Sequence, residues 1–378
     1  MTVVSPTNRP RPTSRWPTRH DFSAVAAHSA SGLLLVSPEA DVVAPLAAAD
    51  RTAAVELAAS TLAAAGLGSG DRVVVALNND GELGGALLAQ AAVSVADAAT
   101  SVGPRGRMRL HRVLEAVRAT TLITTPAGAM DFLARLHLEF LLDPLDLELR
   151  HILLVGEIAS PGTYGQLAAE FEASVVELYA DPFFGVPVAH RDPAGETLTP
   201  VREGLLGLAA PDKDAILDPP YSAGLAEIVV TPTWHSTLAG GTLRSGQVVQ
   251  LHGGETGLPS PVHTIGEHAL IRGRWVSIPK IAAALARIDG ISHWELRLSR
   301  AGTLDAAALH VTFNRDTLVG NPMWKSRIVQ ALVALTPVAI EVVVEPEVSA
   351  ETRPGTVTDL RGHHLGRDRT DPRPQSRP

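Results

Sequence analysis

The chain has 378 residues, a formal net charge of −8 and no cysteine. Its length allows two or three domains with a large core, and its 45% hydrophobic content is that of an ordinary globular protein. The lack of cysteine excludes disulfides, thiolate metal sites, iron–sulfur clusters and a thiol nucleophile. The acidic balance argues against nucleic-acid partners, and no segment reaches the about 18 apolar residues of a membrane helix. Because no apolar signal segment is visible at its start, we expect the chain to be cytoplasmic.

The two ends of the chain differ in composition from its body. Residues 1–21 and 347–378 are rich in proline, arginine and polar side chains. Such segments bury too little apolar surface to offset the entropy of ordering the chain. We therefore expect a disordered leader over 1–21 and a mostly disordered tail over 347–378.

Helical and strand-like segments alternate from about residue 50 to residue 180. Ala/Leu-rich and amphipathic stretches predict helices, over 51–66, 81–95, 106–119, 126–138 and 160–172. Continuous apolar runs between them predict buried strands, over 72–77, 120–125, 149–157 and 174–180. This alternation is typical of an α/β layered fold with a mostly parallel sheet.

Two further patterns follow along the chain. After residue 184, short strands separated by Gly, Pro and Asp turns predict an antiparallel β section. From residue 272, the order strand, helix, strand, turn, strand, helix, strand predicts a compact α+β module with its own core. The predicted organisation is a large N-terminal α/β/β domain over 22–271 and a small C-terminal α+β domain over 272–346.

Two apparent motifs have simpler interpretations. The glycines of "GLGSGD" at 66–71 end a helix and precede a strand, whereas a dinucleotide loop follows a strand and opens a helix. They predict a helix cap and a turn instead. The loop histidines His252, His263 and His268 match no ligand spacing of a known metal site, so no metal site is expected.

A resemblance to a known family rests on the order of several segments. These are "HSASGLLLV" at 28–36, "LAAAGLGSGDRVVVAL" at 62–77, "LRHILLVGE" at 149–157, "SVVELYA" at 174–180, "LRSGQ" at 243–247 and "LIRGRWVSIP" at 270–279. The chain resembles the adenylate-forming (AMP-binding) superfamily of acyl-CoA and aryl-CoA ligases, most closely the phenylacetate–CoA ligase-like branch. The resemblance implies an α/β domain that binds ATP or AMP with Mg²⁺, a small C-terminal lid domain, and transfer of an activated acid to coenzyme A.

The resemblance places the family's phosphate loop at "HSASGLLLV". Ser29, Ser31 and Gly32 are retained as possible phosphate donors. The next three positions, which hold a threonine, a glycine and a lysine in the family, are leucines at 33–35. Because leucine side chains donate no hydrogen bond, we expect a phosphate loop that has lost most of its donors.

Two more nucleotide elements follow from the resemblance. Gly156 and Glu157 match the adenine-side loop. Tyr179 matches the start of the motif that holds Mg²⁺, whereas the closing acid of that motif is replaced by Phe183. The nearest carboxylate is Asp181, two residues early, and it is the candidate for the metal-holding position.

The ribose motif and the hinge motif also match in part. Arg244 fits the ribose motif, but the acid that would accept both ribose hydroxyls is Gln247, and an amide lacks the charge of a carboxylate. Arg272 and Gly273 fit the hinge motif, with Glu267 as its remaining acid.

The catalytic lysine of the family would fall at Thr356. The chain has only three lysines, Lys213, Lys280 and Lys325, and arginine does not reproduce the geometry or hydration of lysine. The catalytic residues therefore stay unassigned.

Three functions remain open from the sequence. The first, favoured by five altered nucleotide elements, is a homologue that no longer adenylates and retains a cleft for a carboxylate, acyl or CoA-like ligand. The second is an active acid–CoA ligase or acyl-adenylate-forming enzyme with an atypical site. The third is a structural or regulatory partner of another protein. The sequence leaves the acid and the oligomeric state open.

Overall fold

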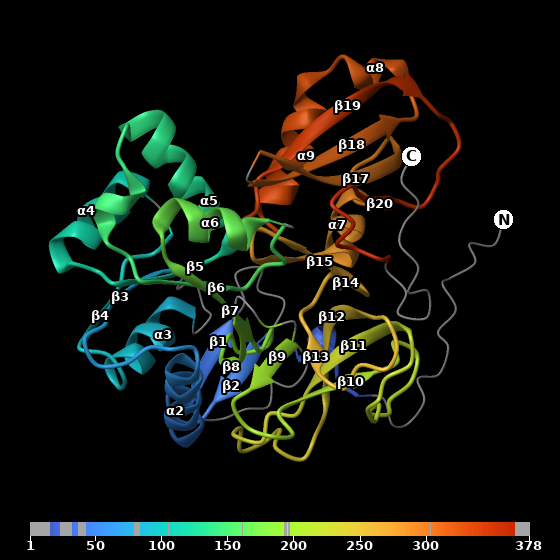
Figure 1. Ribbon diagram of the computed structural model, residues 1–378. Helices are drawn as coiled ribbons and strands as arrows, with labels where there is room; N and C mark the ends of the chain where they lie inside the picture. The colour runs from blue at the N-terminus through green and yellow to red at the C-terminus, as the bar shows by residue number, and fades with distance from the viewer. Residues whose placement is uncertain are drawn as a thin grey trace.

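The computed structural model describes residues 16–22, 32–36, 43–78, 84–104, 106–160, 162–192, 195, 197–302 and 304–366. They form an eight-stranded main sheet, a second β region and a separate four-stranded sheet toward the C-terminal end (Figure 1). The expected α/β class is confirmed. None of the helices in these ranges is long and apolar enough to cross a membrane.

The main sheet is built around five parallel strands in the order β4-β3-β5-β6-β7. Alternate residues of a strand point to opposite faces, so Val73 and Val75 pack in one core while Val74 and Ala76 pack in another. Helices α2 and α3 cover the first face, and α4, α5 and α6 cover the second (Figure 1). Continuous apolar strands therefore appear because both faces are buried.

The elements of this layer agree with the predicted alternation, except that strand β4 was not predicted. The strands are β3 (Arg72–Ala76), β4 (Ala98–Ser101), β5 (Thr121–Thr124), β6 (His151–Val155) and β7 (Ser174–Ala180). The helices are α2 (Ala48–Ala64), α3 (Gly84–Val93), α4 (Arg107–Val117), α5 (Pro126–Arg135) and α6 (Thr163–Phe171). The π-helix η3 (Leu136–Phe140) and the 3-10 helix η4 (Pro144–Leu147) follow α5.

The predicted antiparallel β section forms two arrays. One extends the main sheet with β8 (Pro187–Arg191), β9 (Thr197–Pro200) and β13 (Leu258–Pro259). The other is a four-stranded sheet of β10 (Leu206–Ala209), β11 (Gly224–Val230), β12 (Leu243–Leu251) and β14 (His263–Thr264). Its strands pair antiparallel throughout, as Gly- and Pro-separated short strands predict.

The C-terminal elements enclose a core of their own. The hairpin β15 (His268–Ile271) and β16 (Arg274–Ser277) leads into α7 (Ile278–Leu285). The sheet then has the order β19-β18-β17-β20, and α7 and α9 supply Ile281 and Ile328 to its core. The remaining bounds are β17 (Ile291–Ala301), β18 (Leu304–Phe313), α8 (Asp316–Val319), α9 (Pro322–Val333), β19 (Ile340–Val348) and β20 (Thr356–Asp359).

Both ends of the chain contain structure where disorder was expected. In the leader, Thr18 caps the 3-10 helix η1 (Arg19–Asp21) and forms a bridge with Arg244. In the tail, β20 joins the C-terminal sheet and Thr264 bridges His364. Composition missed both segments because each pairs with a distant part of the chain. The expectation is therefore wrong for residues 16–21 and 347–366, and the rest of both ends lies outside the described residues.

The packing of β20 predicts the effect of a single added methyl group. A Cβ added to Gly355 would overlap the buried indole of Trp294. We expect Gly355→Ala to lower the free energy of unfolding by about 1–3 kcal/mol, the usual cost of overpacking, in urea titrations followed by tryptophan fluorescence. The matched control is Gly320→Ala, whose added Cβ meets nothing within 4 Å. Equal stability of the two variants would contradict this packing.

Candidate functional site

The expected phosphate loop continues into a strand. Leu33 and Leu34 belong to β1 (Leu33–Val36), which pairs with β2 (Val43–Leu46). These two side chains are 49% and 46% exposed, whereas Leu35 is buried in the main core. Gly32 has a φ of +112°, and an added Cβ would lie 2.6 Å from the carbonyl of Leu46, so the position requires glycine. Ser29 and Ser31 lie outside the described residues.

The adenine-side loop and the hinge turn come together. A Cβ on Gly273 would lie 3.4 Å from Glu157 Oε1 and 3.6 Å from the carbonyl of Gly156. Arg272, with a φ of +51°, donates from its backbone N–H to Asp305 at 3.4 Å. The turn of the β15–β16 hairpin therefore rests directly on the loop after β6.

The predicted hinge acid lies apart from this contact. Glu267 is exposed, and its carbonyl accepts the backbone N–H of Ile278.

The expected metal position holds a buried carboxyl group beside a guanidinium. Asp181 is 0% exposed and accepts the backbone N–H of Phe183 at 2.7 Å, while its other carboxyl oxygen has no hydrogen-bond partner. Arg19 donates to the carbonyl of Pro182 at 2.6 Å. Burial raises the pKa of Asp181 to about 7, against the effects of backbone hydrogen bonds and the positive charge of Arg19.

The neighbouring motif positions are also buried. Tyr179 is 3% exposed, and burial raises the pKa of its phenol above the ordinary value, so the hydroxyl stays protonated. Gln247 is 9% exposed and its side-chain carbonyl has no hydrogen-bond partner. Its backbone N–H donates to Ser245 Oγ at 3.0 Å.

Arg244 acts as a structural crosslink. It is 2% exposed, and its guanidinium pairs with Glu227 at 2.6 Å and Asp214 at 2.8 Å. The same group lies over the ring of Trp16 at 5.5 Å from the centroid, and the backbone N–H of Arg244 donates to the carbonyl of Pro17. These contacts join β12 to the leader.

Trp275 lies where the motif loops meet, and sequence reasoning missed it. The indole is 7% exposed and packs with Ile158 and Leu270. An added Cβ on Gly246 would lie 3.7 Å from the ring, and the Arg19 guanidinium lies 5.7 Å from its centroid. The indole thus contacts the loop after β6, strand β12 and the leader. Its position inside the matched hinge segment was the signal that could have identified it.

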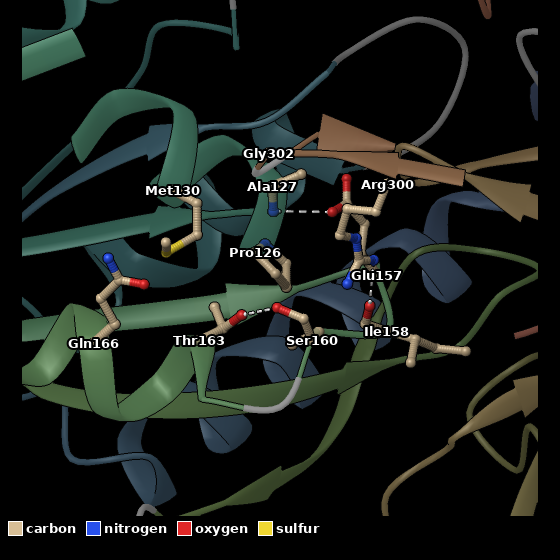
Figure 2. A pocket seen from close by; sticks show the side chains of 11 residues that line it. Pro126, Ala127, Met130, Glu157, Ile158, Ser160, Thr163, Gln166, Arg300 and Gly302 are labelled. Carbon is tan, nitrogen blue, oxygen red and sulfur yellow. Dashed lines mark hydrogen bonds between the residues drawn. The ribbon is translucent and has the colours of Figure 1, made fainter. Parts of the chain in front are cut away.

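A polar pocket of about 140 Å³ adjoins the Glu157 side of this arrangement. Its walls are the N-terminal turns of α5 and α6, the loop after β6 and the end of β17, which supplies Arg300 (Figure 2). The polar and sulfur-bearing side chains at its walls are Met130, Glu157, Ser160, Thr163, Gln166 and Arg300. Both the main sheet layer and the C-terminal sheet therefore contribute to one pocket.

Hydrogen bonds fix the polar groups of the pocket. Glu157 Oε2 accepts the backbone N–H of Ala127 at 3.0 Å, and the hydroxyls of Ser160 and Thr163 lie 2.7 Å apart (Figure 2). Arg300 pairs with Asp305 at 2.9 Å. No sequence pattern marks Arg300, because only the fold brings the end of β17 to α5.

The environment of Glu157 favours its neutral form. Burial raises the pKa of the carboxyl to about 7, and the nearby carboxylate of Asp305 acts in the same direction. The N–H of Ala127, the hydroxyl of Thr125 and the charge of Arg300 oppose this rise. Near neutral pH the group therefore exchanges between a hydrogen-bond donor and an anion.

Comparisons with known proteins identify the fold. A structure of 2-hydroxyisobutyryl-CoA ligase with 2-HIB-AMP and CoA gives a TM-score of 0.73 at 14% identity, covering 92% of this chain and 80% of that one. A malonyl-CoA ligase with methylmalonyl-CoA and AMP gives 0.58 at 14% identity, covering 81% and 68%. The chain has the fold of the adenylate-forming acyl-CoA ligases. The resemblance found in the sequence is thus confirmed at the level of the fold.

An amide bond synthetase has the same fold. The amide bond synthetase McbA from Marinactinospora thermotolerans gives a TM-score of 0.59 at 14% identity, covering 84% of this chain and 65% of that one. No protein-family model and no curated protein matches the chain.

One conformational state of 2-hydroxyisobutyryl-CoA ligase fits better than the others. The 0.73 score belongs to its thioesterification state, whereas its open conformation gives 0.56 and its postadenylation states give 0.58 and 0.54. The four comparisons cover 91–92% of this chain.

Burial of Asp181 predicts a pH-dependent stability. Since the pKa of Asp181 in the folded state lies above its ordinary value of 3.8, the folded state binds the proton more tightly than the unfolded state. Stability therefore falls as pH rises from about 4 to about 7. We expect Asp181→Asn to raise the free energy of unfolding by about 1–3 kcal/mol at pH 8 and to change it little at pH 4. Urea titrations at both pH values measure the difference.

The exposed Asp212→Asn serves as the control and should change stability equally at both pH values. A gain for Asp181→Asn that is independent of pH would contradict the raised pKa.

Proposed function

We propose that this chain is a ligand-binding protein that uses the acyl-CoA ligase fold without forming adenylates. Its ligand is a small carboxylate or acyl group, alone or as the end of a CoA-like thioester. The observation that carries the proposal is the placement of Arg300 beside Glu157 in a pocket with walls from both parts of the chain. The phenylacetate–CoA ligase-like branch and a cytoplasmic location belong to the same proposal.

The nucleotide positions support the absence of adenylation. A developing negative charge on a transferring phosphate needs positioned cations and donors. The positions matched to the phosphate loop hold leucines, and Arg244 is already paired with Glu227 and Asp214. Thr356, at the position of the catalytic lysine, is an exposed residue at the start of β20.

The residues at the expected metal position do not fit Mg²⁺. This ion takes several oxygen ligands in near-octahedral geometry. In the described part of the chain, no group of three or more His, Asp or Glu side chains is arranged to hold a metal. One oxygen of Asp181 is held by a backbone N–H, and Arg19 already brings positive charge to the carboxyl. No step of the proposed function uses the ion.

The pocket supports a small acid as ligand. Its volume of about 140 Å³ is well above the about 10–15 Å³ that a single water needs, so it has room for a small molecule. A guanidinium is suited to a carboxylate. That of Arg300 is paired with Asp305 through Nε, but its side chain is 21% exposed and lines the pocket, whereas the doubly paired Arg244 is 2% exposed. The neutral form of Glu157 donates a hydrogen bond to an anion where its ionised form would repel it. Met130 adds an apolar wall for the rest of the ligand.

Calorimetric titration with short aliphatic and aryl carboxylates, and with their CoA thioesters, tests the proposal. We expect binding at pH 6 that weakens at least fivefold by pH 8, because Glu157 loses its proton through about pH 7. Arg300→Ala should weaken binding at least tenfold at pH 6, a loss of about 1.4 kcal/mol. Glu157→Gln should bind equally at both pH values.

The exposed Arg315→Ala is the matched control and should bind as the unaltered chain does. Absence of binding by every acid and thioester would overturn the ligand-binding proposal in favour of a structural or regulatory role. Binding that Arg300→Ala leaves unchanged would place the ligand elsewhere.

A further inference from the structure

The last described residues of the chain return to the N-terminal β region. We call residues 361–366 the C-terminal latch. Its backbone pairs with Thr264 and Gly266. The N–H of Leu365 donates to the carbonyl of Thr264 at 3.0 Å, and the N–H of Gly266 donates to the carbonyl of Gly366 at 3.2 Å. The N–H of Thr264 donates to the carbonyl of His363. The latch therefore continues the sheet of β12 and β14 by one short strand-like segment.

Side chains of the latch are buried in this contact. Leu365 is 2% exposed and packs with Val248 and Ile265 of the N-terminal β region. His364 is likewise 2% exposed. A segment that was merely lying on the surface would leave these side chains in water, so the contact is part of the folded core.

Arg361 fastens the other end of the latch. Its side chain is 3% exposed and pairs with Asp359 at 2.9 Å and with Asp305. It also donates to the carbonyl of Leu270, in β15, at 3.0 Å. One guanidinium thus connects β20, the β17–β18 hairpin and the hairpin that precedes α7. Removing one partner from such a buried group is costly, because the remaining charges lose their compensation.

Besides the contacts of the hinge turn and of Trp275, the latch is a second backbone connection between the two parts of the fold. The first is the chain itself, which passes from β14 through residues 265–267 into the β15–β16 hairpin. With the latch, the C-terminal sheet is held to the N-terminal β region at both its entrance and its exit. The latch pairs with residues 264–266, directly beside this connecting segment. A body attached by one segment can rotate about it, whereas a second, paired segment with buried side chains restrains that rotation.

We propose that the C-terminal latch fixes the C-terminal sheet in a single orientation, so that this chain does not alternate between domain arrangements. Structures of 2-hydroxyisobutyryl-CoA ligase in different states match this chain with TM-scores from 0.54 to 0.73, so that protein has more than one arrangement. In the arrangement seen in this chain, Arg300 reaches the pocket. The latch does not depend on the proposed ligand, since its contacts are all within the chain.

Distance measurements between two spin labels test the latch directly. The chain has no cysteine, so Glu115→Cys on α4 and Lys325→Cys on α9, both exposed, place one label on each part. We compare the full chain, a chain ending at Gly362 and a matched control ending at Gly366 by double electron–electron resonance. The control removes only residues beyond the latch.

We expect one narrow distance distribution in the full chain and in the control. In the chain ending at Gly362, that distribution should broaden or gain a second maximum. Leu365→Pro in the full chain, which removes the N–H donated to Thr264, should give the same change if the shortened chain does not fold. An unchanged narrow distribution in both altered chains would overturn the proposal, as would two distances in the full chain. Neither result depends on whether a carboxylate binds.

Discussion

The buried carboxylate of Asp305 connects the main features of this molecule. It pairs with Arg300, which reaches the pocket, and with Arg361, which fastens the C-terminal latch. It also accepts the backbone N–H of Arg272, in the turn that rests on the loop after β6. Asp305 is 5% exposed, and a buried charge of this kind is tolerated only with close, well-directed partners. Pocket, hinge turn and latch are therefore held by one ionic cluster and should be lost together.

Two buried carboxyl groups support the proposal that this chain does not form adenylates. Asp181 and Glu157 both have raised pKa values because burial removes the water that would stabilise their charge. At the first, the chain supplies its own cation, Arg19; at the second, it provides an exchangeable proton beside Arg300. The charge of Arg19 already compensates Asp181, so a metal ion bound to a triphosphate would add little there. The proton of Glu157 and the charge of Arg300 suit a small anion. A shared architecture is compatible with the different chemistry that we propose, because function is determined by sites and not by folds.

The sequence predicted the layered architecture well, because it depends on local patterns. Continuous apolar runs predicted β3, β5, β6 and β7, because a strand buried on both faces is apolar along its whole length. Helical periodicity of apolar residues predicted α4 and α6. Sequence-based prediction failed at residues whose burial depends on contacts with distant parts of the chain. Arg361 and Leu365 belong to a polar, proline-rich tail. They are buried only because they pack against strands that are distant in the sequence. Arg300 and Trp275 became visible only when the fold brought β17 and the β15–β16 hairpin to the motif loops, and composition carries no trace of such pairings.

The exchange of pyrophosphate into ATP is the most direct measurement of the central claim, that this acyl-CoA ligase fold no longer forms adenylates. The assay should use the full chain with ATP, Mg²⁺ and the same carboxylic acids that are titrated for binding. We expect no exchange above the enzyme-free blank with any acid, including an acid that binds in the pocket. Exchange that requires Mg²⁺ and saturates with one acid would contradict the claim and show that the atypical site is a working one.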